Sequence, residues 1–227
     1  MISHPYSGFY IAFEGIDHSG KSTQYQLFLK RLKKEFPNRE IVATREPGGT
    51  PMGERIRKIL LSKNELKILP LPEAHLFAAS RGEGIPRIII PALERGAVVV
   101  SDRCYAASET FQGAGRGLGI EFVRKLNEEV INGIFPNKIV VCDVTAEMAS
   151  GRKIEGELDR IEREKIDFHQ RVRRAYLFLA KQNPEQFLVV DGSRPREKIA
   201  EIIWKEIAPL MVNDEINIEL RIKRGRE

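Results

Sequence analysis

The sequence has few cysteines and no long apolar run, and these two scarcities exclude several classes of protein. Its 227 residues include two cysteines and one tryptophan. Two cysteines are too few for a disulfide framework, and Cys104 and Cys142 do not have the spacing of metal ligands. No apolar run reaches about 18 residues, so a membrane-spanning helix is not expected. The first residues also lack the pattern of a secretory signal. We therefore expect a cytoplasmic protein with two buried free thiols.

The charge balance allows a packed core and narrows the choice of partners. Hydrophobic residues make up 42% of the chain, and 37 basic against 32 acidic residues give a net charge of +5. A basic excess is typical of proteins that bind nucleic acid, acidic membranes or small phosphorylated ligands. Here the excess is modest and is not gathered into a basic arm. We expect small phosphorylated partners, with no nucleic acid and no membrane.

Five short apolar segments alternate with helical patterns. Most of these segments are apolar almost throughout, as is typical of strands covered on both faces in a parallel sheet. Strands that alternate with helices predict an α/β fold in which a five-stranded parallel sheet is flanked by helices in three layers. The expected strands are Phe9–Glu14, Ile41–Arg45, Ala97–Asp102, Lys138–Val144 and Phe187–Asp191.

The last fifteen residues differ from the rest. We expect one domain over residues 1–212, with a long charged helix over Leu158–Gln182 and a final helix over Pro195–Ile207. Residues 213–227 alternate strictly between polar and apolar side chains over Ile216–Ile222. This alternation favours an added edge strand or a frayed tail, and strand addition across a partner is the alternative.

The strongest motif follows the first strand. Residues 15–22 read Gly-Ile-Asp-His-Ser-Gly-Lys-Ser and fit the phosphate loop (P-loop) pattern without a gap. Glycines let successive N–H groups point at one anion, and the helix N-terminus adds partial positive charge. Lys21 is expected to reach the outer phosphates of ATP and Ser22 to hold Mg²⁺. The expected ATP-binding residues are Gly15, Ile16, Asp17, His18, Ser19, Gly20, Lys21, Ser22 and Thr23.

Charged side chains also stand at the ends of two other expected strands. Asp102 ends an apolar strand at the edge where open α/β sheets bind ligands, so it is the candidate carboxylate on the metal side. Arg45 and Arg103 stand at the same edge, and two guanidiniums there can bind a second phosphate through forked hydrogen bonds. A second anion beside the first predicts phosphoryl transfer between two nucleotides.

At this point the sequence resembles the thymidylate kinases, P-loop enzymes that phosphorylate dTMP with ATP. The resemblance covers about Phe9 to Ile207 and is carried by several segments in order. These segments read FEGIDHSGKST, TREPGGTPMGERIR, LFAASR, SDRCYAASETFQGAGRGL, DVTAEM, GELDRIE and FHQRVRRAYLFLA. The family implies a P-loop NTPase fold with a mobile lid, and Mg²⁺ with ATP as co-substrate. It also implies a homodimer and phosphorylation of dTMP to dTDP.

The resemblance assigns roles to individual residues. It implies that Arg45 and Arg103 hold the dTMP phosphate, that Asp17 lies near that phosphate and the sugar, and that Phe77 stacks on thymine. Arg81 is then expected to hydrogen-bond the edge of the base. Three further residues, Ser108, Phe111 and Gln112, match positions that line the base or the sugar. Because the acceptor phosphate is already largely ionised at neutral pH, no general base is needed.

One position departs from the family pattern. Family members place an arginine in the phosphate loop after the Asp, or carry an arginine-rich lid. This chain has His18 in the loop and a lid over about residues 151–160 with few arginines. We expect Arg152, Lys153 or Arg160 to meet the transferring phosphoryl group, and protonated His18 is the competing candidate.

Two other functions stay open from sequence alone. The chain could be another P-loop nucleoside or nucleoside monophosphate kinase, or a nucleotide-binding protein without turnover. Nucleoside kinases need a base to activate a neutral hydroxyl, whereas Arg45 and Arg103 favour a charged acceptor.

Overall fold

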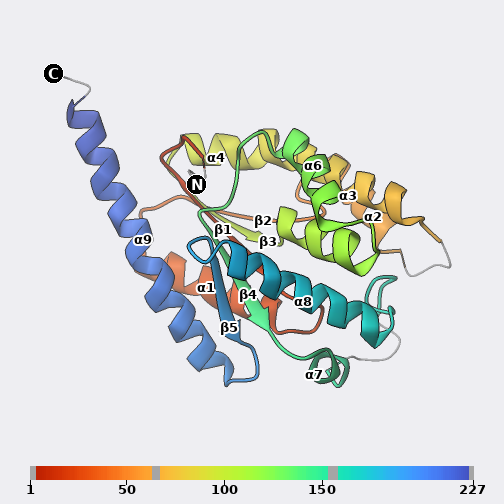
Figure 1. Cartoon of the computed structure of the whole chain (residues 1–227). Helices are drawn as coiled ribbons and strands as arrows, with labels where there is room; N and C mark the ends of the chain where they lie inside the picture. Colours follow the sequence, from red (N-terminus) through yellow and green to blue (C-terminus); the bar gives the residue numbers. More distant parts are fainter. Residues whose placement is uncertain (1–3, 63–66, 153–157, 225–227) are drawn as a thin grey trace.

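Five parallel strands form one sheet in the order β2-β3-β1-β4-β5 in this computed structural model (Figure 1). The structure describes residues 4–62, 67–152 and 158–224, with side chains up to Met211. The strands are β1 Phe9–Glu14, β2 Ile41–Arg45, β3 Val98–Asp102, β4 Lys138–Asp143 and β5 Phe187–Asp191. The predicted α/β fold and its parallel sheet are confirmed, and strand bounds differ from expectation only at Ala97 and Val144.

Helices cover both faces of the sheet, which gives three layers (Figure 1). One face is covered by α1 and α9, and the other by α2, α3, α6 and α8. The larger helices are α1 Lys21–Glu35, α2 Pro51–Leu60, α3 Pro70–Gly84, α6 Ile120–Ile131, α8 Ile166–Gln182 and α9 Arg196–Arg224. Shorter elements are η1 Ile85–Ile89, α4 Ile90–Glu94, α5 Tyr105–Ser108, η2 Glu109–Gly115 and α7 Ala146–Ser150.

The central strand shows why these runs are apolar almost throughout. Every residue of β1 is buried. Phe9, Ile11 and Phe13 pack in the core shared with α1 and α9, whereas Ala12 belongs to the core on the opposite face. Side chains of a strand point alternately to its two faces, so a strand covered on both sides needs apolar residues at nearly every position. Glu14 is buried in this strand although it is charged.

The long charged helix begins later than predicted. It was expected from Leu158, but α8 starts at Ile166. The carboxylate of Asp159 accepts hydrogen bonds from the backbone N–H groups of Ile161 (2.8 Å) and Glu162 (3.0 Å). An Asp that bonds the backbone two and three residues ahead stabilises a turn in competition with a helix. The segment before Ile166 is therefore held as turns, and it lies against the phosphate loop.

The expected edge strand at the C-terminus is wrong. Residues 213–224 instead continue α9, which runs from Arg196 to Arg224 through Pro209 and extends past the sheet in Figure 1. Glu, Leu, Arg and Lys favour helix, and an alternating pattern without a strand to pair with does not fix an extended backbone. Strand addition across a partner, the alternative, stays a prediction.

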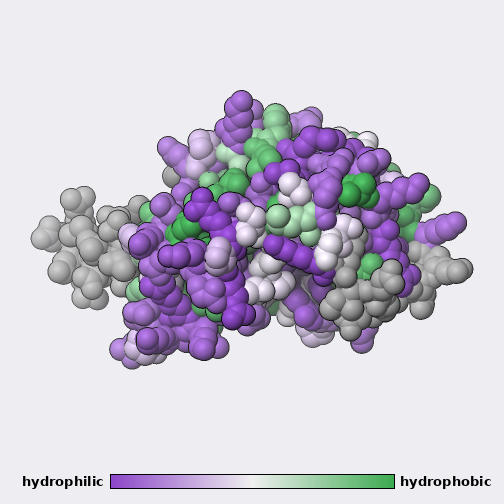
Figure 2. All heavy atoms as spheres, turned by 90° about the horizontal axis from the view of Figure 1, so that it is seen from below, coloured by the Kyte–Doolittle hydropathy of each residue, from purple (hydrophilic) through white to green (hydrophobic). Residues whose placement is uncertain are grey.

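The surface is dominated by hydrophilic residues on the face shown in Figure 2, where hydrophobic residues lie in small separate groups. Among the residues that the structure describes, no helix combines the length and apolar character needed to cross a membrane.

Candidate active site

The phosphate loop connects the end of β1 to the first turn of α1. Gly15 (φ 145°) and Gly20 (φ 90°) have backbone angles that L side chains rarely adopt. A Cβ at Gly15 would lie 2.7 Å from both the Cys142 carbonyl oxygen and Ser19 Oγ, so only glycine fits there. His18 also has a left-handed backbone, with φ 60°. All predicted loop residues except Gly15 line a cleft of about 430 Å³.

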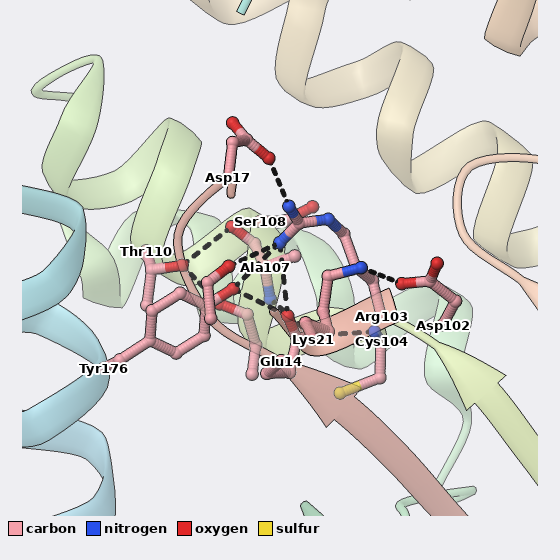
Figure 3. Close-up of polar contacts among 12 residues, drawn as sticks. Glu14, Asp17, Lys21, Asp102, Arg103, Cys104, Ala107, Ser108, Thr110 and Tyr176 are labelled. Atoms are coloured by element: carbon pink, nitrogen blue, oxygen red, sulfur yellow. Dashed lines mark hydrogen bonds and ion pairs between the residues drawn. The ribbon is translucent and has the colours of Figure 1, made fainter. Parts of the chain in front are cut away.

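Lys21 and Asp102 form a close ion pair inside this cleft (Figure 3). Burial, and then the charge of Arg103, lower the pKa of Lys21 below its ordinary value. Burial acts to raise the pKa of Asp102, but Lys21 and Arg103 outweigh it and lower that pKa. The charged form is therefore favoured for the Asp102 carboxylate and disfavoured for the Lys21 amine, relative to the free side chains. A polyphosphate in the loop offers Lys21 a stronger partner than the single carboxylate.

Arg103 is a cation of the cleft that is contacted on several sides (Figure 3). Its guanidinium donates to the Asp17 carboxylate (2.5 Å) and to the Gly15 carbonyl (2.9 Å), and it lies over the Phe111 ring at 4.8 Å. Burial opposes its charged form, but Asp17 and further nearby acidic groups raise the pKa of Arg103. The side chain is therefore always charged and is fixed by contacts on several sides.

The buried carboxylate of Glu14, which the sequence analysis did not single out, holds the chain where it passes from β3 into α5. Glu14 accepts hydrogen bonds from the backbone N–H groups of Cys104 (2.8 Å) and Ala107 (3.2 Å) and from the Tyr176 hydroxyl (2.6 Å). It also lies 3.5 Å from Arg103. The available signal was a lone acidic residue at the end of a fully apolar strand. Tyr176 comes from α8, far along the chain.

The second predicted arginine of the acceptor site is on the cleft wall, but its guanidinium is paired elsewhere. Arg45 makes a forked contact with Glu54 at 3.1 and 2.8 Å, and half of its side chain is exposed. Arg57 also lines the cleft and donates to the Pro47 carbonyl at 2.9 Å. The sequence analysis missed Arg57, although it lies in the quoted motif TREPGGTPMGERIR. Arg45, Arg57 and Arg103 bring three guanidiniums to one cleft.

The residues predicted to contact the base fall into two layers. Phe77, Phe111 and Gln112 line the cleft, whereas Arg81 and Ser108 are not among the described residues that line it. Arg81 is 2% exposed and donates to Glu46 (2.7 Å), Asn127 (2.6 Å) and Ser108 (3.1 Å). Aromatic rings therefore line this part of the cleft, and the polar side chains of Arg81 and Ser108 lie behind them. A direct contact of Arg81 with a base stays a prediction.

The cations predicted for the lid lie in different places. Arg152 lines the cleft and donates to the carbonyls of His18 (3.3 Å) and Gly192 (3.2 Å). Arg160 instead donates to Glu73 (2.5 Å) and to the Leu60 carbonyl (3.1 and 3.2 Å). Lys153 lies outside the described residues. His18 Nε2 is 3.4 Å from Glu162, a distance that makes an ion pair only when the imidazole is protonated. Of the cations predicted for the lid, Arg152 is therefore the one that the described residues place on the cleft wall.

Comparisons with known proteins agree with this geometry. Residues 13–203 match the family model described as thymidylate kinase. Curated thymidylate kinases from Kosmotoga olearia and Symbiobacterium thermophilum are 46% and 43% identical, covering 87% and 89% of this chain and 94% of each relative. The crystal structure of thymidylate kinase from Ehrlichia chaffeensis superposes with a TM-score of 0.72 at 30% identity, covering 88% of this chain and 98% of that one. The chain is an enzyme of the P-loop NTPase fold and belongs to the thymidylate kinase family.

Proposed function

We propose that the protein transfers the γ-phosphoryl group of Mg-ATP to dTMP, giving dTDP and ADP. One observation carries the proposal: a single cleft is lined by a phosphate loop with Lys21 and by the two arginines Arg45 and Arg103. The loop suits the ATP phosphates, and the two guanidiniums suit a phosphate monoester. Two anion sites in one cleft match a reaction between two nucleotides.

The chemistry needs alignment and charge neutralisation rather than a base. The attacking oxygen belongs to a phosphate whose second pKa is about 6, so it is already ionised at neutral pH. Arg103 holds the acceptor phosphate near Asp17, and Lys21 holds the outer phosphates of ATP. Cations fixed before the reaction stabilise the charge that spreads over the transferring group without reorganising.

Two side chains fit the metal of Mg-ATP. The hydroxyl of Ser22 and the carboxylate of Asp102 both line the cleft, and oxygen donors are the ligands that Mg²⁺ prefers. The described residues contain no cluster of three or more His, Cys, Asp or Glu able to hold a metal ion. Phosphate oxygens and waters commonly complete such sites. Bound Mg²⁺ would neutralise charge on the β- and γ-phosphates.

Arg152 is our choice for the cation that meets the transferring phosphoryl group. It comes from the lid side and already contacts the backbone of His18 in the phosphate loop. Arg160 is engaged with Glu73, and the His18 imidazole lies 3.4 Å from the Glu162 carboxylate. A guanidinium also stays charged at any pH where the enzyme is folded.

The nucleoside of dTMP is placed against the aromatic wall of the cleft. Phe77 offers a ring for stacking on the base, and Phe111 lies beside Arg103, near the expected position of the sugar. Gln112 offers an amide to the base edge. Arg81 and Ser108 contribute from the second layer, or directly after rearrangement around the bound base.

Assembly and compartment follow the family expectation. Adjoining helices α2, α3 and α6 expose large apolar side chains, namely Met52, Ile59, Leu71 and Phe122. We infer that these side chains are buried between two copies in a homodimer formed by helix packing. Cys104 and Cys142 are free, buried thiols, as expected in the reducing cytoplasm.

An acceptor panel tests the proposed reaction. ADP release is measured with ATP and, in turn, dTMP, dUMP, thymidine and dCMP. We expect dTMP to be the best acceptor and thymidine to be inert, because thymidine offers no phosphate to Arg45 and Arg103. Turnover with thymidine but not with dTMP would identify a nucleoside kinase. ATP binding without turnover of any acceptor would identify a non-catalytic protein.

A further inference from the structure

A buried carboxylate connects the lid segment to the wall of the cleft. Glu73, in the first turn of α3, is fully buried. It accepts hydrogen bonds from Gln112 Nε2 (2.9 Å), Arg116 Nε (3.1 Å) and Arg160 Nη1 (2.5 Å). A buried charge is costly to keep, and apolar side chains of similar size often stabilise a fold as well or better. The contact with Gln112 points to a role for the Glu73 carboxylate other than stabilising the fold.

Two arginines form ion pairs with the Glu73 carboxylate. Arg116 and Arg160 have side chains that are 14% and 13% exposed, so both guanidiniums are largely withdrawn from water. Arg160 also donates to the Leu60 carbonyl, and Arg116 lies over the Phe168 ring at 4.9 Å. Each arginine is thus held from a second side. The carboxylate is contacted by both guanidiniums, and a carboxylate offers only acceptors.

This carboxylate determines how the amide of Gln112 is oriented. The Gln112 NH₂ group donates to Glu73, which suits a carboxylate that two arginines contact and that offers only acceptors. Gln112 is 1% exposed and lines the cleft. Among the described residues, no donor contacts its Oε1 atom. The carbonyl oxygen is therefore the part of the amide left for a ligand in the cleft.

We propose that Glu73 is a positioning residue that fixes Gln112 with its carbonyl oxygen toward the nucleotide. The cleft then presents an acceptor to the ring nitrogen of a pyrimidine. Thymine and uracil carry a proton on N3 and can donate to this oxygen. Cytosine has an unprotonated N3, so two acceptors would face each other and both would lose their hydrogen bonds with water. The inference rests on the proposed binding of a pyrimidine nucleotide in this cleft.

A double-mutant cycle tests the assignment. We would measure kcat/KM for dTMP, dUMP and dCMP with the unmodified protein, Glu73→Gln, Gln112→Ala and the double variant. Glu35→Gln is the matched control, because Glu35 is exposed on α1, away from the cleft. In Glu73→Gln we expect the preference for dTMP over dCMP to fall about tenfold or more, since the Gln112 amide can turn over. The preference for dUMP over dCMP should fall in parallel, while the KM for ATP stays within about twofold of the unmodified value, since Gln112 faces the acceptor.

The double variant separates positioning from a structural effect. If Glu73 acts through Gln112, Glu73→Gln should change the dTMP/dCMP ratio no further in the Gln112→Ala background. An equal loss for both nucleotides in Glu73→Gln, or additive effects in the cycle, would overturn the proposal. If the unmodified protein does not turn over dTMP, the proposed function fails. In that case the preferences for dTMP and dUMP over dCMP are measured as ratios of Kd by calorimetry. The same outcomes of the double-mutant cycle then support or overturn the role of Glu73.

If the Glu73→Gln variant does not fold, a measurement on the unmodified protein still tests the proposal. The NMR signal of the Gln112 side-chain NH₂, assigned with Gln112→Ala, should exchange slowly with solvent before any nucleotide is added, because Glu73 holds it. Rapid exchange without nucleotide would overturn the proposal.

Discussion

Arg103 donates a hydrogen bond of 2.5 Å to Asp17, which lies inside the phosphate loop that precedes it by 86 positions. This contact joins the proposed acceptor-phosphate site directly to the proposed ATP site. The Arg103 guanidinium also donates to Glu14 and to the Gly15 carbonyl, and Arg103 lines the cleft. A phosphate that enters finds the cation already in place, so little ordering of Arg103 is needed on binding.

Removing the Tyr176 hydroxyl should loosen this arrangement. In Tyr176→Phe, Glu14 loses a hydrogen bond of 2.6 Å while the ring stays in the core. We expect stability to fall by about 1 kcal/mol, the usual worth of one hydrogen bond. We also expect kcat/KM for dTMP to fall about threefold to tenfold, since Arg103 is less well oriented. Chemical denaturation and steady-state kinetics check both values. An unchanged kcat/KM for dTMP would contradict the positioning role of Glu14.

The sequence predicted those features that depend on local patterns. Apolar runs such as Phe9–Phe13 identified the strands, because a strand covered on both faces needs apolar residues at nearly every position. The phosphate loop was predicted because each of its residue types serves one local geometry. Glu14, Arg57 and Glu73 were missed, since their roles depend on partners such as Tyr176 that are distant along the chain.

The failures have equally local causes. The alternation over Ile216–Ile222 favoured a strand, but the helix started at Arg196 continues with residues that also favour helix. Arg152 and Arg160 are indistinguishable in the lid sequence. Only the fold shows that Arg152 lies on the cleft wall and that Arg160 lies against Glu73.

Replacing the lid cation should affect turnover much more than replacing His18. In Arg152→Ala we expect kcat to fall about 100-fold or more, the usual effect of removing a cation from a phosphoryl-transfer site. In His18→Gly we expect kcat to stay within about threefold between pH 6 and pH 8, because His18 is not the required charge. Steady-state assays across this pH range compare the two variants. A large loss in His18→Gly confined to low pH would show that protonated His18 is the cation instead.

The lowered pKa of Lys21 predicts an early loss of ATP affinity at alkaline pH. Burial and Arg103 disfavour the protonated amine, so Lys21 loses its charge below the ordinary lysine pKa of about 10.4. Affinity for ATP in the absence of dTMP should therefore decline before that pH is reached. Calorimetric titrations from neutral to alkaline pH measure this decline. In Lys21→Ala, binding should be weaker and nearly flat with pH, and an equally steep decline in that variant would assign the titration to another group.

Gly15 should tolerate no side chain. The Cβ of Gly15→Ala would approach the Cys142 carbonyl and Ser19 to 2.7 Å on a backbone with φ 145°. We expect a stability loss of about 1–3 kcal/mol from this strain and a marked loss of ATP affinity. Gly84→Ala is the control, because its Cβ meets no atom within 4 Å in a helix. Thermal unfolding with and without ATP compares them. Equal behaviour of the two variants would contradict the close approach at Gly15.

The most direct test follows the γ-phosphoryl group itself. ATP labelled with a heavy oxygen isotope in that group is incubated with the protein and dTMP, and the products are separated and weighed by mass spectrometry. The account predicts that the label appears in the terminal phosphoryl group of dTDP, with little in inorganic phosphate because the acceptor is aligned and water is excluded. Label that accumulates in inorganic phosphate at the same rate with and without dTMP would contradict transfer between two nucleotides in this cleft.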